Sequence, residues 1–129
     1  MRLLQIGLGG FGRSWAELAR RADGIDYLGA VDPDPAARAW AERNLGMPAG
    51  SLYPSLADAL DAADFEAVLL ATPPATHHPV GLAALGAGKH VLVEKPLATT
   101  LPDAQELVAA AATANRILAA NAPEELEEE

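Results

Sequence analysis

The first candidate site is the glycine-rich segment at residues 7–12 (GLGGFG), which matches the pattern G-x-G-x-x-G and follows an apolar run. In such loops the first glycine permits a tight turn, the second lets the backbone approach a pyrophosphate, and the third lets the next helix pack closely on a sheet. The N-terminus of that helix offers free N–H groups and a partial positive charge to the phosphates. The predicted pyrophosphate site comprises Gly7, Gly9, Gly10, Phe11, Gly12 and Arg13.

The second candidate is Asp32, which stands twenty residues after Gly12 at the end of a predicted strand. Its carboxylate can accept hydrogen bonds from the hydroxyls of an adenine ribose, so the two motifs together predict a dinucleotide site. A carboxylate here would repel the 2′-phosphate of NADP, and we therefore expect NAD, with NADP less favoured. Arg13 is expected beside the pyrophosphate and Arg38 on an exposed helix face. The alternative role for Asp32 is a turn or helix cap before Pro33.

Two later segments also follow predicted strands, at the sheet edge where open α/β folds bind their ligands. They are residues 71–79 (ATPPATHHP) and residues 88–98 (GKHVLVEKPLA). Together with the glycine loop, they resemble the N-terminal domain of the Gfo/Idh/MocA oxidoreductases. That family includes glucose–fructose oxidoreductase and the inositol dehydrogenases. The resemblance covers about residues 1–120.

The resemblance implies that a second group of residues surrounds the ribose and nicotinamide of the cofactor: Thr72, Pro73, His77, Glu94, Lys95 and Pro96. In the family this lysine assists proton transfer at the reacting hydroxyl, so Lys95 is the expected catalytic residue. Pro96 is implied to hold its loop, often through a cis peptide bond. Hydride transfer from an alcohol needs a group that manages the hydroxyl proton, and a lysine of lowered pKa can do this. The alternatives are a solvated loop lysine at Lys95 and a helix-start capping residue at His77.

Short apolar runs alternate with helical patterns along the chain, as expected for successive βαβ units. We predict an α/β, three-layer Rossmann fold, in which a six-stranded parallel sheet of order 3-2-1-4-5-6 carries helices on both faces. The predicted strands are residues 3–6, 27–31, 51–53, 67–71, 90–94 and 116–120. The predicted helices are residues 13–22, 35–45, a short helix capped by Ser55, 77–87 and 100–115.

Composition limits the classes of protein that this chain can represent. Its 129 residues, 50% of them hydrophobic, are enough for one domain with a core. With no cysteine, disulfides and Cys-based zinc sites are excluded, and no His, Asp or Glu spacing suggests another metal site. The net charge of −9 argues against nucleic-acid binding, and no apolar run is long enough for a membrane span. A cytoplasmic location is therefore expected.

The C-terminal region departs from the family pattern. Five of the last six residues are glutamates, so we predict a dinucleotide-binding domain at residues 1–122 and an acidic, solvated tail at residues 123–129. Family members continue into a second domain that supplies the substrate pocket. Because this chain is expected to lack that domain, we expect it to bind NAD without turning substrate over. Surface left near residues 71–75 and Leu97 is expected to favour a homo-oligomer.

Two alternatives remain open. The first is a small, self-sufficient dehydrogenase that builds its substrate pocket between subunits. The second is a non-catalytic module that senses NAD or acts as a scaffold. A methyltransferase with a related fold is disfavoured by Gly12 and by the Glu-Lys-Pro segment at residues 94–96.

Overall fold

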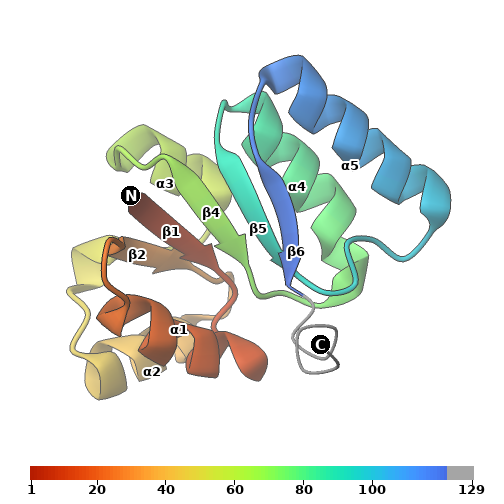
Figure 1. The fold of residues 1–129 in the computed structure, drawn as a ribbon. Helices are drawn as coiled ribbons and strands as arrows, with labels where there is room; N and C mark the ends of the chain where they lie inside the picture. The colour runs from red at the N-terminus through yellow and green to blue at the C-terminus, as the bar shows by residue number, and fades with distance from the viewer. Residues whose placement is uncertain (122–129) are drawn as a thin grey trace.

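The computed structural model describes residues 1–121, except for the side chains of Phe11 and Asn121. Six parallel strands form one sheet in the order β3-β2-β1-β4-β5-β6 (Figure 1), which confirms the predicted fold and strand order. The strands are β1 (Arg2–Ile6), β2 (Asp26–Val31), β3 (Leu52–Tyr53), β4 (Ala67–Leu70), β5 (His90–Glu94) and β6 (Leu118–Asn121). The predicted tail at residues 123–129 lies outside the described residues.

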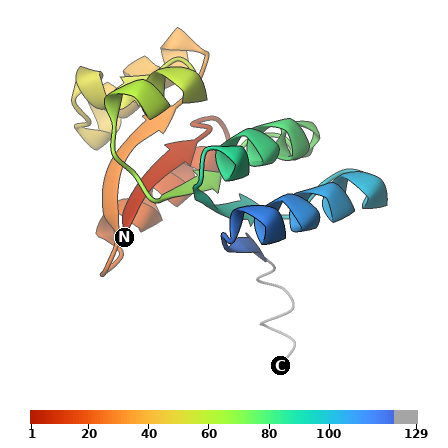
Figure 2. The same cartoon turned by 90° about the horizontal axis from the view of Figure 1, so that it is seen from above.

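Helices cover both faces of this sheet, which gives the predicted three layers. They are α1 (Phe11–Arg21), α2 (Pro35–Leu45), α3 (Leu56–Ala62), α4 (His77–Gly86) and α5 (Leu101–Ala114). Helices α1 and α2 pack on one face through small side chains such as Ala16 and Ala41. Helices α3, α4 and α5 pack on the other face, where α4 and α5 lie side by side (Figure 2).

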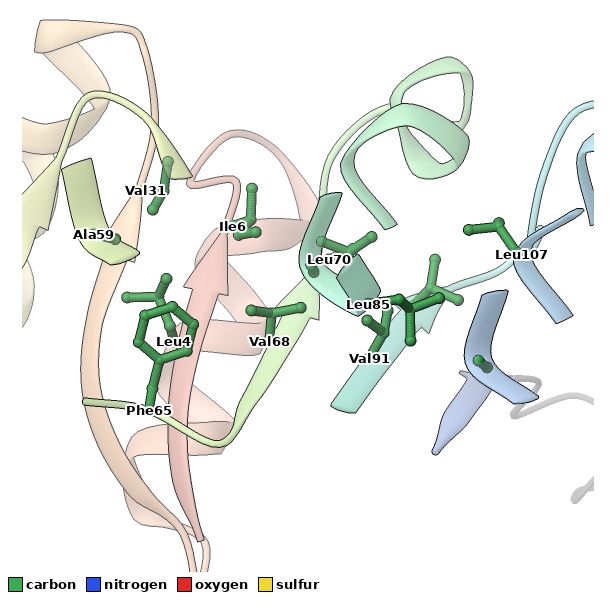
Figure 3. Close-up of a cluster of buried hydrophobic side chains, with 13 residues drawn as sticks. Leu4, Ile6, Val31, Ala59, Phe65, Val68, Leu70, Leu85, Val91 and Leu107 are labelled. Carbon is green, nitrogen blue, oxygen red and sulfur yellow. The ribbon is translucent and has the colours of Figure 1, made fainter. Parts of the chain in front are cut away.

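The largest core cluster lies between the central strands and helices α3 to α5 (Figure 3). Leu4 and Val68, from neighbouring strands β1 and β4, are completely buried there. The alternate residues Leu3 and Leu69 are buried on the opposite face. Because both faces of these strands are covered, an uninterrupted apolar sequence is favoured over an alternating one. This burial fixes the central strands, whose carboxyl ends carry the candidate site.

Short polar side chains cap the starts of α2, α3 and α5, and they account for the accuracy of these three predicted starts. Ser55 accepts a hydrogen bond from the amide of Asp58 at the start of α3, and Thr100 accepts one from Asp103 at the start of α5. Each satisfies an amide that the first turn leaves without a helical partner. Two short 3-10 helices, at Ala49–Ser51 and Pro74–Thr76, occupy connections. The first shortens β3 to two residues, so Ser51 is not in the strand as predicted.

The predicted start of the sixth strand at Arg116 is wrong by two residues. Helix α5 ends at Ala114 and is capped by Asn115, whose φ of 54° is in the left-handed region. The amide of Arg116 then donates to the carbonyl of Ala111. This helix-ending arrangement uses the backbone of Arg116, so strand pairing begins only at Leu118. Within residues 1–121, no helix combines the length and the apolar character needed to cross a bilayer.

Candidate functional site

A cleft of about 840 Å³ opens at the carboxyl ends of the central strands. This size falls within the range of roughly 300–1,000 Å³ that is typical of cofactor and ligand sites. The cleft extends from the end of β2 across β1 and β4 to the end of β5. Its lining includes these predicted site residues: Gly7, Gly9, Gly10, Asp32, Thr72, Pro73, Glu94 and Lys95. The sheet therefore brings three separate sequence motifs together around one cleft.

Three glycines of the loop have different surroundings. Gly7 has a φ of +105°, and a Cβ added to it would lie 2.5 Å from the carbonyl oxygen of Ala71. A Cβ on Gly12 would collide with the carbonyl oxygen of Gly7. A Cβ on Gly9, by contrast, would meet no protein atom within 4 Å. Gly7 and Gly12 thus serve the close packing of loop, sheet and helix, whereas Gly9 lies beside open space in the cleft.

The loop also leaves backbone donors at the N-terminus of α1. The amides of Gly12 and Arg13 donate to the carbonyls of Gly9 and Gly10, but among residues 1–121 the amides of Gly9 and Gly10 have no protein acceptor. No side chain caps this end of α1, and its first turn contains no acidic residue. Free N–H groups at a positive helix end can bind phosphate oxygens. Phe11 begins this helix, and its side chain lies outside the described atoms.

Asp32 is held at the β2 end of the cleft by two backbone amides. Its Oδ2 accepts from the amide of Leu8, and its Oδ1 accepts from the amide of Asp34, both at 2.9 Å. Each carboxylate oxygen can accept a further hydrogen bond, which a ribose hydroxyl could supply. The cap of α2 is Asp34, whose side chain accepts from the amide of Ala36.

Two arginines lie around the same strand end. The Arg13 guanidinium lies 4.4 Å from the centre of the Trp40 ring on α2, and its Nε donates to the carbonyl of Leu8. The Arg38 guanidinium donates to the main-chain carbonyl of Asp32 at 2.7 Å. Arg38 is half-buried, because its guanidinium reaches back to the end of β2. The expectation that Arg38 is an exposed helix residue is therefore wrong. Neither arginine is among the residues that line the cleft.

His77 begins α4, near the β5 end of the cleft, and does not line the cleft. The ring is only 1% exposed, with Nδ1 at 2.7 Å from the carbonyl of Pro96 and Nε2 at 2.9 Å from the carbonyl of Thr72. Carbonyl oxygens only accept hydrogen bonds, so a neutral ring donates to one of them and a doubly protonated ring donates to both. His77 therefore ties the loop after β4 to the loop after β5.

The Glu-Lys-Pro segment lies at the end of β5. The Lys95–Pro96 peptide bond is cis, as the family resemblance implies. Lys95 is exposed and lines the cleft beside Glu94. The Glu94 carboxylate accepts a hydrogen bond from the indole N–H of Trp15, on α1. Among the described residues, no group of three His, Cys, Asp or Glu side chains is arranged to hold a metal ion.

Two residues that support the site are not predicted by the sequence motifs. One is Trp15, which holds Glu94. The other is Gln5, a completely buried residue of β1 whose side chain contacts the glycine loop. The available signal for Gln5 was a single amide side chain within an otherwise apolar strand. Trp15 gave no comparable signal, because a tryptophan on one face of a helix is typical of a core residue.

Residues 1–122 match the model of a family described as oxidoreductases with an NAD-binding Rossmann fold, GFO_IDH_MocA. The chain is 41% identical over 107 residues to an inositol 2-dehydrogenase of Leifsonia xyli, covering 80% of this chain and 30% of the relative. It is 36% identical over 116 residues to a 1,5-anhydro-D-fructose reductase of Ensifer adhaerens, covering 90% of this chain and 34% of the relative. The chain thus spans about a third of the length of these curated relatives.

Solved structures give a similar result. An NAD-binding protein from Listeria innocua superposes with a TM-score of 0.84 at 32% identity, over 93% of this chain and 34% of that one. The WlbA dehydrogenase from Bordetella pertussis, solved with NADH and UDP-GlcNAcA, superposes with a TM-score of 0.84 at 29% identity. This match covers 93% of this chain and 36% of that one.

Proposed function

Because the chain belongs to the Gfo/Idh/MocA oxidoreductase family, with its NAD-binding Rossmann fold, we propose that residues 1–122 bind NAD(H) along the cleft and prefer it to NADP(H). The observation that carries this proposal is the single cleft that joins the glycine loop, Asp32 and the Glu94–Lys95 segment. Its length along the sheet edge suits a ligand with two nucleoside halves and a central pyrophosphate.

The proposed orientation of the dinucleotide follows from the chemistry of each part of the cleft. The pyrophosphate lies over Gly9 and Gly10, where free amides and the end of α1 attract its charge. The adenine ribose lies at the Asp32 carboxylate, and the nicotinamide lies near Thr72 and Lys95. Gly9 supports this orientation most directly, since the space that its missing Cβ leaves open is where a phosphate must approach the backbone.

The preference for NAD(H) rests on the fixed charge of Asp32. Two backbone amides hold its carboxylate in place, so the group cannot easily turn away from a 2′-phosphate that carries like charge. Arg38 is the nearest cation to the main chain of Asp32, but its guanidinium is engaged by the Asp32 carbonyl. The cost of placing two negative groups together therefore favours the cofactor without the extra phosphate.

The reaction class proposed for the family site is hydride transfer between a polyol or sugar carbon and the nicotinamide, which accepts or supplies the hydride when bound. The names of the two curated relatives support this substrate class. In the oxidation, the C–H bond breaks with its electron pair and the hydroxyl loses a proton. Lys95, in its unprotonated form, would accept that proton at Nζ. We propose that the present chain binds the cofactor without turning substrate over.

A second candidate is a dehydrogenase that completes its substrate pocket between copies of the chain. Pro73, Pro74 and Ala75 are exposed at the mouth of the cleft, which favours association at this edge. Light scattering with and without NADH tests the association. Oxidation of polyols by the wild type, lost in Lys95→Ala, would support this candidate, whereas binding without turnover would support the cofactor-binding domain.

Calorimetric titration of the full chain with NADH tests the proposed function directly. The expected result is one saturable site per chain, with ADP-ribose competing for it. NADPH is expected to bind more weakly. The absence of saturable binding at millimolar NADH would overturn the proposal.

A further inference from the structure

Gln5 is the one polar residue among the four buried residues of β1, and it is completely buried. Its Nε2 donates to the carbonyl of Gly7 at 2.8 Å and to the carbonyl of Gly12 at 2.6 Å. Gly7 is the first residue of the glycine loop, and Gly12 lies in the first turn of α1. One side chain therefore joins the two ends of the loop from behind, on the side away from the cleft.

Tyr27, on the neighbouring strand β2, completes this arrangement. Its hydroxyl donates to Oε1 of Gln5 at 2.9 Å. Burial raises the pKa of the Tyr27 hydroxyl well above its usual value, although the charge of Arg20 opposes this effect, so the hydroxyl keeps its proton. The two loop carbonyls can only accept, which requires the NH₂ group of Gln5 to face them and leaves its oxygen for Tyr27. The amide thus has a single favourable orientation.

This network acts on the part of the loop that faces the cleft. With Gly7 and Gly12 tied together, the backbone between them is held in the conformation that leaves the amides of Gly9 and Gly10 without protein acceptors. The close approach also leaves no space for a side chain, because a Cβ on Gly12 would lie 3.4 Å from Nε2 of Gln5 and would collide with Gly7. Donors that are held in place before binding lose less entropy when they bind a phosphate.

We propose that Gln5, oriented by Tyr27, is a positioning residue that preorganises the glycine loop for the pyrophosphate of the cofactor. The inference rests on the proposed binding of NAD(H). It adds to the G-x-G-x-x-G motif a requirement for a buried side chain, that of Gln5, which the motif does not specify. Gln5 is not among the residues that line the cleft. Its effect passes through the backbone of the loop and should therefore be felt by any ligand that carries the diphosphate.

Gln5→Met tests this role, since methionine has a similar length and volume but cannot donate to the two carbonyls. Lys89→Met is a matched control, because it also removes a side-chain donor from a main-chain carbonyl, that of Phe65, at a place remote from the cleft. We expect Gln5→Met to weaken NADH and ADP-ribose to the same extent, by about tenfold, and Lys89→Met to leave both unchanged. Tyr27→Phe should have a smaller effect in the same direction.

Hydrogen exchange at the amides of Leu8 and Gly12, which donate to the Asp32 carboxylate and to the carbonyl of Gly9, gives a second measurement that needs no ligand. We expect faster exchange in Gln5→Met and Tyr27→Phe, and the wild-type rate in Lys89→Met. Wild-type affinity or wild-type loop exchange in a folded Gln5→Met chain would overturn the inference. If Gln5→Met does not fold, ligand affinity and amide exchange measured on Tyr27→Phe decide whether the inference holds. Failure of the wild type itself to bind NADH would overturn the proposed function, while the exchange rates would still decide whether Gln5 orders the loop.

Discussion

The indole N–H of Trp15 donates a hydrogen bond to the carboxylate of Glu94, although the two residues are 79 positions apart in the chain. Trp15 lies on α1, the helix that follows the glycine loop, and Glu94 ends β5 beside Lys95. The tryptophan ring also packs in the cluster that contains Leu92. This contact connects α1 with the end of β5, and it fixes the carboxylate next to Lys95.

Trp15→Phe should weaken binding of the nicotinamide half of the cofactor selectively. Phenylalanine keeps most of the packing but cannot donate to Glu94, so the Glu94–Lys95 segment loses one of its supports. We expect a severalfold weaker affinity for NADH and an unchanged affinity for ADP-ribose, measured by calorimetry. Trp40→Phe is the comparison, since Trp40 contacts Arg13 at the other end of the site. Equal loss of both ligands in Trp15→Phe would contradict the assignment.

Asp32→Asn should shift the cofactor preference toward NADP(H). The substitution keeps one acceptor for the neighbouring backbone amides but removes the charge that opposes the 2′-phosphate. We expect the ratio of the NADPH and NADH dissociation constants to fall by about tenfold or more. Asp34→Asn is a close control, because it removes an equal charge two residues away and asparagine still caps α2. A ratio that is the same in both variants would show that the position of the charge is unimportant.

His77→Leu should destabilise the fold, because it leaves the carbonyls of Thr72 and Pro96 without their buried donor. The expected loss in the free energy of unfolding is about 2–4 kcal/mol, measured by urea denaturation. The adjacent His78 provides the control, since its Nε2 contacts Glu106 at 2.6 Å on the surface. His78→Leu should cost less than about 1 kcal/mol. Similar losses in the two variants would contradict the role assigned to His77.

Most of the fold could be predicted from local sequence signals, whereas the contacts that hold the site residues in place could not. Apolar runs and short polar caps were enough to predict the strands and most helix boundaries, because these depend on nearby residues. The strand order followed from the Rossmann fold that the motifs indicate. The error at Arg116 arose because Asn115 adopts the left-handed conformation, which residues other than glycine adopt rarely. The contact of Trp15 joins residues 79 positions apart, and the contacts of Gln5 depend on how the glycine loop folds back over β1. No spacing rule encodes either arrangement.

Alanine at two glycines of the loop should separate stability from binding. In Gly12→Ala the new Cβ would collide with the carbonyl of Gly7, so we expect a loss of about 2 kcal/mol or more in the free energy of unfolding. In Gly9→Ala the Cβ would meet no protein atom within 4 Å, so the chain should fold with almost unchanged stability.

The binding of NADH should rank the two variants differently from their stability. Gly9→Ala should weaken NADH by at least about tenfold, because its methyl group occupies the space through which the pyrophosphate approaches the backbone. Urea denaturation and calorimetry on the same preparations measure both effects. Normal NADH binding by a stable Gly9→Ala chain would place the pyrophosphate elsewhere in the cleft, since a phosphate bound to the free loop amides cannot avoid that methyl group.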